Sequence, residues 1–388
     1  MTRTLCLAAA VLALIACSRD KKADPPAPLV DFVPTVRVDR LWQSSVDGEN
    51  PLLRLGLGLG QNAEAVFAAG AGGDVAAIEP RTGRTIWRTR TRARLGGGTG
   101  AGEELVAVGS LDGEVIALEA ADGKIRWRAR VGGEILSAPA VAATAVVVRT
   151  VDGKLLALAA EDGRELWREE QSVPRLSLRG TARPVIAGDL VVCGFDNGKL
   201  LAVNLADGST VWETSVAPAR GRTELERLID IDAQVQIRED DVFVVGFQGR
   251  AALLALDSGQ VWWARDLSSF RGLDVDDEYV IVATADGDVV ALQRRTGVEV
   301  WRQDALKRRG LSAPAIVGSY VAVADFQGYV HWLDKASGVP AARTQVGARV
   351  SNAPLVRDGT LIVIDDTGRL AAFRPRVSSA GAAPTPGR

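Results

Sequence analysis

The stretch from Val106 to Trp127 reads VAVGSLDGEVIALEAADGKIRW, and its pattern returns along the whole chain. An apolar strand runs into a turn that ends in glycine, a second apolar strand follows, and a second glycine precedes a tryptophan. Successive first glycines lie 38 to 51 residues apart, at Gly73, Gly113, Gly153, Gly198, Gly249, Gly287, Gly328 and Gly368. A period of about 40–45 residues is typical of β-propeller blades. The sequence therefore predicts an all-β, eight-bladed β-propeller of four-stranded blades.

Each repeated residue has a physical role in this fold. The first glycine closes a tight hairpin that requires a positive φ. Five residues later comes an apolar side chain, which we expect to pack between blades: Ile78, Leu118, Leu158, Val203, Leu254, Leu292, Leu333 and Phe373. The tryptophan after the second glycine is expected to dock on the neighbouring blade. Six units carry it, as Trp87, Trp127, Trp167, Trp212, Trp263 and Trp301, whereas the seventh has Ala342.

The eighth unit ends before its outer strand. Val38 to Val46 (VDRLWQSSV) contains Trp42 and has no blade before it. We expect this N-terminal segment to complete the eighth blade, because such closure removes an exposed sheet edge.

The N-terminus has the pattern of an exported lipoprotein. Residues 1–16 carry Arg3 and then an apolar run that is too short to span a bilayer, which indicates a signal peptide. The run ends at Leu14-Ile15-Ala16-Cys17, which resembles a bacterial lipobox and makes Cys17 the expected lipidation site. The alternative is an ordinary signal peptide with an incidental cysteine. Ser18 follows, and by resemblance to other lipoproteins it indicates the outer membrane, with the protein facing the periplasm.

The sequence divides into four parts on this interpretation. After the signal peptide, residues 17–35 are expected to form the lipidated cysteine and a flexible, proline-rich tether. Residues 36–374 form the propeller. Residues 375–388, rich in Ala, Gly, Ser and Pro, are expected to be a disordered tail.

Composition argues against several functions. The formal net charge is −2 and 24% of residues are charged, so there is no basic excess for nucleic acid. Cys193 lies in an apolar strand pattern and is expected to be a core residue. His331 is the single histidine and is interpreted as a packed strand residue, so we expect no catalytic metal and no cofactor.

Two connections between blades are longer than the others. The proline that opens the next blade lies 17 residues after Trp167, but only 12 residues after Trp127. The first glycine of the next blade lies 37 residues after Trp212. Long loops on repeat folds are often binding surfaces. The candidate partner-binding residues are Leu176, Leu178 and Arg179 in the first connection, and Asp230 and Asp232 in the second. Taken singly and without a family resemblance, the residues favour the alternative that the leucines are core and the charges are solvated.

The unit DGxxxALxxxxGxxxW resembles the repeat of pyrroloquinoline-quinone-type propellers. A narrower resemblance is to the BamB family, lipoprotein propellers of the outer-membrane β-barrel assembly machine. Two motifs carry it, LSLRG at residues 176–180 and TELERLIDID at residues 223–232, together with the lipobox, the tether and the eight repeats.

The resemblance implies a scaffold without catalytic activity. Its partners would be the POTRA domains of BamA, the rest of the assembly machine and, as an open possibility, unfolded outer-membrane proteins. Two alternatives remain from the residues alone, a quinone-dependent dehydrogenase and a polysaccharide-binding propeller.

Overall fold

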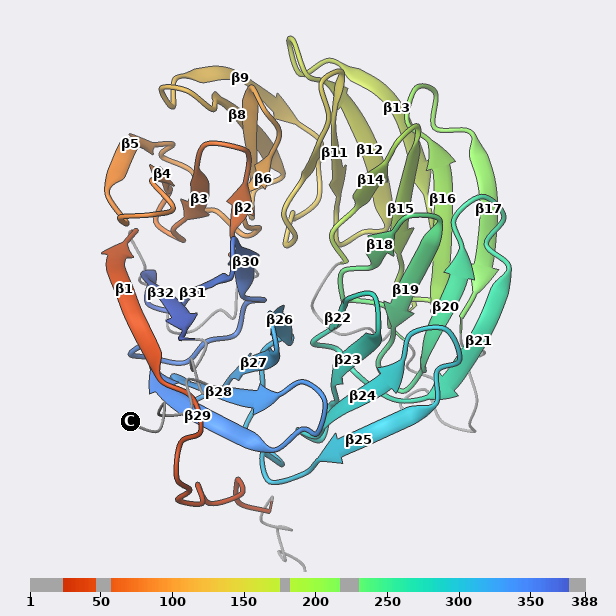
Figure 1. The fold of residues 1–388 in the computed structure, drawn as a ribbon. Coiled ribbons are helices and arrows are strands. Elements are labelled where there is room, and N and C mark those ends of the chain that lie inside the picture. Colours follow the sequence, from red (N-terminus) through yellow and green to blue (C-terminus); the bar gives the residue numbers. More distant parts are fainter. Residues whose placement is uncertain (1–23, 47–56, 175–181, 217–229, 377–388) are drawn as a thin grey trace, which may run out of the picture.

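The computed structural model describes residues 24–46, 57–174, 182–216 and 230–376. These residues form eight antiparallel sheets of four strands each, set as blades around a central axis (Figure 1). The prediction of an eight-bladed all-β propeller is confirmed. Within the described ranges, no helix is long and apolar enough to cross a membrane.

The strands fall into four classes by their place in the blade, and blades are numbered here from β2 onward. The innermost strands are β2 (Gly60–Gln61), β6 (Gly100–Ala101), β10 (Ala140–Val141), β14 (Val185–Ala187), β18 (Gln236–Arg238), β22 (Leu273–Val275), β26 (Ala315–Val317) and β30 (Leu355–Arg357). The second strands are β3 (Val66–Ala69), β7 (Leu105–Gly109), β11 (Ala145–Arg149), β15 (Leu190–Gly194), β19 (Asp241–Val245), β23 (Tyr279–Ala283), β27 (Tyr320–Ala324) and β31 (Thr360–Ile364).

The remaining two classes complete each blade towards the rim. The third strands are β4 (Asp74–Ile78), β8 (Glu114–Glu119), β12 (Lys154–Ala159), β16 (Lys199–Asn204), β20 (Arg250–Ala255), β24 (Val289–Gln293), β28 (Tyr329–Asp334) and β32 (Arg369–Pro375). The outermost strands are β5 (Thr85–Arg90), β9 (Ile125–Arg130), β13 (Glu165–Glu170), β17 (Thr210–Ser215), β21 (Val261–Asp266), β25 (Glu299–Gln303), β29 (Pro340–Gln345) and β1 (Val38–Ser45).

Burial follows the position of a strand in its blade. The second and third strands have neighbours on both faces, so their residues are nearly all apolar and buried, as in β7 and β8. The apolar residues five positions after each first glycine are at most 2% exposed, and they belong to clusters shared by adjacent blades. The outermost strands instead alternate, with one buried tryptophan among exposed residues.

The tryptophans four residues after a second glycine, together with Trp42, dock on the next blade at that blade's second glycine. The indole Nε1 of Trp87 donates to the Ala120 carbonyl at 2.8 Å. Gly123 lies under the ring with φ +73°, and a Cβ there would stand 2.4 Å from Trp87 Cε3. Seven tryptophans make the same donation, in the pairs Trp42–Pro80, Trp87–Ala120, Trp127–Ala160, Trp167–Leu205, Trp212–Leu256, Trp263–Arg294 and Trp301–Lys335.

The N-terminal strand closes the ring. β1 pairs with β32 from Val38↔Pro375 to Ser45↔Arg369, so it is the outermost strand of blade eight. Trp42 is 7% exposed and docks on blade one like the other tryptophans. The predicted closure is confirmed. The last strand runs through Pro375, one residue beyond the predicted end of the propeller.

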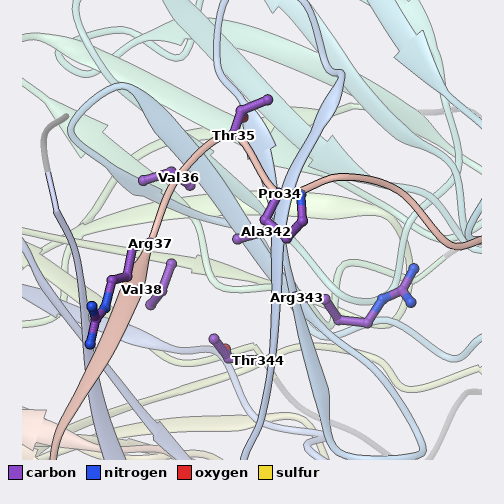
Figure 2. Close-up of a pocket in the computed structure, with 8 residues that line it drawn as sticks. All are labelled: Pro34, Thr35, Val36, Arg37, Val38, Ala342, Arg343 and Thr344. Atoms are coloured by element: carbon purple, nitrogen blue, oxygen red, sulfur yellow. The ribbon is translucent and has the colours of Figure 1, made fainter. Parts of the chain in front are cut away.

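The contact between blades seven and eight is different, and it explains Ala342. Blade eight has no turn between its third and outermost strands, because β32 and β1 are far apart in the chain, so no glycine is available to receive a tryptophan. The chain entering the ring occupies this place instead (Figure 2). The amides of Thr35 and Val36 donate to the Ala341 carbonyl at 2.9 and 3.4 Å, and Val36 is buried.

Residues 25–35, predicted to be part of a flexible tether, lie against blades six and seven. Hydrogen bonds to Pro25, Ala27 and Val30 hold this segment along the ring. Composition predicted flexibility because prolines preclude regular pairing, but a proline-rich backbone keeps free carbonyls that arginines on the ring can bind.

Candidate partner-binding site

The two lengthened connections emerge on the same side of the ring. One joins β13 to β14 and the other joins β17 to β18, so each leads from an outermost strand to the innermost strand of the next blade. All such connections leave from one end of the disc, which we call the connection face. Leu176, Leu178 and Arg179 in the first connection lie outside the described residues, as does Cys17. Asp230 and Asp232 are described.

Asp230 and Asp232 lie near the end of the second long connection, and the side chain of Asp230 points into the protein rather than away from it. Asp230 forms an isolated antiparallel bridge with Phe247, whose amide donates to the Asp230 carbonyl at 2.7 Å. The side chain of Asp230 is fully buried, and Asp232 is partly buried. The sequence alternative of solvated charges therefore does not describe Asp230.

A third carboxylate and an arginine join them. Asp196 lies in the turn between β15 and β16 and is 4% exposed. It pairs with the guanidinium of Arg149, the last residue of β11, which is 1% exposed. Arg149 also donates to the Gly194 carbonyl at 2.8 Å and stacks over Phe195, 4.6 Å from the ring centre. The residues thus come from blades three and four and from the connection to blade five.

Asp196, Asp230 and Asp232 form what we call the acidic cluster. One carboxylate oxygen from each lies within 4.8 Å of the others. Burial, and next the negative charge of Asp196, raise the pKa of Asp232 to about 7. Its Oδ1 has no hydrogen-bond partner within the described part of the chain. The negative charges of Asp232 and Asp196 oppose each other in this buried setting, which is unfavourable at low dielectric.

This arrangement suits a cationic ligand. An arginine or lysine side chain could donate to Asp232 and offset the repulsion from Asp196. A divalent metal is the other class that clustered carboxylates can hold. The guanidinium of Arg149 already neutralises Asp196, which weighs against a metal and favours a single additional positive charge.

Sequence reasoning missed Arg149 and Asp196, although the repeat contains a signal for both. Arg149 ends a second strand where other blades have small or apolar residues, such as Gly109 and Ala283. Asp196 occupies a turn position that is Leu111 in blade two and Val151 in blade three. A search for charged residues at apolar repeat positions would have found them.

The other groups singled out in the sequence are packed as expected. Cys193 is fully buried, and burial raises the pKa of its thiol to about 11, so the thiol is protonated and inert. His331 lies in β28 with 4% exposure, and its Nε2 is 3.0 Å from the Asp325 carboxylate. Burial lowers the His331 pKa. The interpretation of both as packed strand residues is confirmed.

The central channel contains a cavity of about 490 Å³, lined by the innermost strands. Its charged groups already have partners. Arg238 donates to the Val275 carbonyl at 2.7 and 3.0 Å, and Asp274 accepts from the Ile316 amide at 2.7 Å. The lining holds no histidine or cysteine among the described residues.

Comparison with known proteins decides the family. A family profile described as "Outer membrane protein assembly factor BamB" matches residues 71–303 and 285–376. The chain belongs to the BamB family. The protein of that name from Pseudomonas aeruginosa is 44% identical over 375 residues, covering 95% of this chain and 98% of the relative. That from Marinobacter adhaerens is 48% identical over 368 residues, covering 94% of each.

Solved structures agree with the BamB assignment. The crystal structure of BamB from Moraxella catarrhalis superimposes with a TM-score of 0.80 at 26% identity, covering 87% of this chain and all of that one. A europium-containing methanol dehydrogenase matches with a TM-score of 0.68 at 12% identity, covering 89% of this chain and 95% of that one. At that identity the second likeness shows a shared fold and nothing of activity.

Proposed function

We propose that this BamB-family chain is a non-enzymatic scaffold of the outer-membrane protein assembly machine and binds the POTRA domains of BamA. Relatives that match nearly its full length are named outer membrane protein assembly factors. The proposed role makes and breaks no covalent bond. The quinone-dependent dehydrogenase remains an alternative by fold alone.

The acidic cluster carries the proposal. The acidic cluster lies near the end of one lengthened connection. The other lengthened connection leaves the neighbouring blade on the same face. In the proposed interface Leu176 and Leu178 are apolar anchors, and Arg179 with Asp230 and Asp232 set the register. Asp232 meets the cation, while the buried Asp230 lies beside it in the same acidic cluster.

A binding titration with the POTRA domains of BamA tests this interface. We expect Leu178→Ala and Arg179→Ala in the mature chain to weaken affinity by about thirtyfold, as hot-spot residues do, with an unchanged melting temperature. Leu166→Ala, an exposed residue of β13, is the matched control and should leave affinity unaltered. A lowered melting temperature with normal affinity would make Leu178 a core residue and contradict the interface.

Attachment to the outer membrane through Cys17 is a separate part of the proposal. Its support is the lipobox, Leu14 to Cys17. Two or more acyl chains suffice for stable anchoring. Cys17→Ser should release the protein into the soluble periplasmic fraction or leave the signal peptide uncut. Unchanged outer-membrane fractionation of that variant would exclude Cys17 as the anchor.

Unfolded outer-membrane proteins are the second partner class that we propose. The rim supports this, because the residue before the buried tryptophan is apolar and exposed in several outermost strands: Val211 at 46%, Trp262 at 59% and Val300 at 47%. Exposed apolar side chains on open strand edges suit extended, apolar segments. Trp262→Ser should reduce capture of an unfolded barrel protein by the purified chain, and equal capture would count against it.

A further inference from the structure

The N-terminal segment is clasped by the connection between blades six and seven. The amide of Ala27 donates to the Lys307 carbonyl at 3.0 Å. Arg308 Nε donates to the Pro25 carbonyl at 2.8 Å, and Arg309 Nη1 donates to the Ala27 carbonyl at 2.9 Å. Three consecutive ring residues therefore hold the backbone at the start of the segment. We call residues 25–36 the strap.

Further along, the strap is held by side chains on blade seven. Arg343 donates to the Val30 carbonyl at 2.9 Å and lies over the Phe32 ring, 5.2 Å from its centre. Leu29, Val30 and Phe32 line a mostly apolar cavity of about 270 Å³ against β28 and β29. Ala342 also lines it, at the position where other outermost strands have tryptophan. The small residue thus leaves room for the strap beside blade seven.

The contacts give the strap a direction across the disc. Lys307 to Arg309 belong to the β25–β26 connection, so Pro25 lies on the connection face. Thr35 and Val36 bond to Ala341, near the start of β29, which is at the opposite face. The strap crosses the thickness of the ring and then returns as β1. The lipid-bearing end of the chain therefore departs from the connection face, beside blades six and seven.

We infer that the strap turns the connection face towards the lipid bilayer, with blades six and seven nearest to it. This inference rests on the proposed lipid anchor. Cys17 is eight residues from Pro25, and an extended chain spans at most about 3.6 Å per residue, so the rim at Arg308 stays within about 29 Å of the membrane surface. If the strap were released, the free chain would extend from Cys17 to Val36, and the greatest distance between the ring and the membrane surface would rise to about 68 Å.

The inference also locates the proposed partner. The acidic cluster belongs to the same connection face, at blades three to five. A partner bound there would lie between the ring and the membrane, or beside the space between them. It would not lie on the face that points into the periplasm.

Energy transfer to the bilayer tests this orientation. The lipidated full-length protein is bound to phosphatidylethanolamine/phosphatidylglycerol vesicles that contain a fluorescent acceptor lipid, and carries a donor on one added cysteine. Asp304→Cys places the donor after β25 on the connection face, and Ala206→Cys places it in the β16–β17 turn on the opposite face. The buried Cys193 does not compete for label. We expect greater transfer from position 304 than from position 206.

Strap variants give the matched comparison. Phe32→Asp puts a charge into the apolar cavity and should release the strap, which reduces or abolishes the difference between the two positions. Val33→Asp adds the same charge at a residue that is 86% exposed, and should preserve the difference. Equal transfer from bound wild-type protein, or greater transfer from position 206, would overturn the orientation alone. Failure to bind vesicles would overturn the lipid anchor, and the inference with it.

Discussion

The rim of the ring and the acidic cluster are built in opposite ways. On the rim, seven tryptophans donate to seven carbonyls, and one arrangement is repeated from blade to blade. In the cluster, three carboxylates and Arg149 are brought together once among the described residues, and Arg149 stands where other blades have small or apolar residues. The repeated arrangement stabilises the fold. The single arrangement is unfavourable for stability, which is typical of a site held for function.

The largest expected loss of stability comes from opening the ring. Deleting Val38–Val46 removes β1 and Trp42, and exposes the long edge of β32. We expect the free energy of unfolding to fall by on the order of 5 kcal/mol or more, which is beyond the effect of most single substitutions. Urea unfolding measures it. Deleting residues 25–33 instead leaves every blade with four strands and should cost much less; equal losses would refute closure by β1.

A single tryptophan dock is the next largest effect. Trp87→Ala removes a buried ring and its hydrogen bond, so we expect a loss of about 3–5 kcal/mol with unchanged partner affinity of the folded protein. Trp87→Phe keeps most of the ring and should lose about 1 kcal/mol for the hydrogen bond to Ala120. Ile86→Ala changes the exposed neighbour in the same strand and serves as the control. If thermal unfolding does not distinguish Trp87→Ala from Ile86→Ala, the docks do not stabilise the rim.

The glycine side of the dock should give a smaller effect. Gly123→Ala places a Cβ 2.4 Å from Trp87 and also strains a backbone with φ +73°. Gly359→Ala has a similar φ of +69° but no atom within 4 Å, so it reports the backbone strain alone. We expect Gly123→Ala to be less stable than Gly359→Ala by about 1–3 kcal/mol, the usual range for overpacking. Similar melting temperatures would show that the ring relaxes around the extra methyl group.

The repeated residues made the fold predictable from sequence. The glycine spacing predicted the number of blades, and the missing outer strand of the eighth repeat predicted the role of β1. The repeat pattern also showed that Ala342 stands where other repeats have tryptophan, but it did not show why. The cause is that blade eight has no turn to receive a tryptophan, and that depends on how the chain enters the ring.

The site was harder to predict because its residues are far apart in sequence. The long connections and the family motifs led to Asp230 and Asp232, but not to Arg149 or Asp196, which lie in regular parts of blades three and four. Nothing in the spacing of the two aspartates indicates that Asp230 is buried. The docking of the strap was also missed, since proline content indicates poor pairing but says nothing about arginines elsewhere on the ring.

Asp232→Asn changes the charge of the cluster with little change of shape, and it separates stability from function. The folded pKa of about 7 lies above the ordinary value of 3.8, so between these pH values the folded state binds the proton more tightly than the unfolded chain. The wild-type protein therefore loses stability as the pH rises from about 4 to about 7. The variant should lack this loss.

The deciding measurement is POTRA-domain affinity together with thermal unfolding of Asp232→Asn at pH 5 and pH 8. We predict that the variant melts like the wild type at pH 5, melts at the same or a higher temperature at pH 8, and binds about tenfold or more weakly at pH 8 because the cation loses its carboxylate. A lower melting temperature at pH 8 with wild-type affinity would show that the acidic cluster holds the fold together, and would contradict its assignment as the partner site.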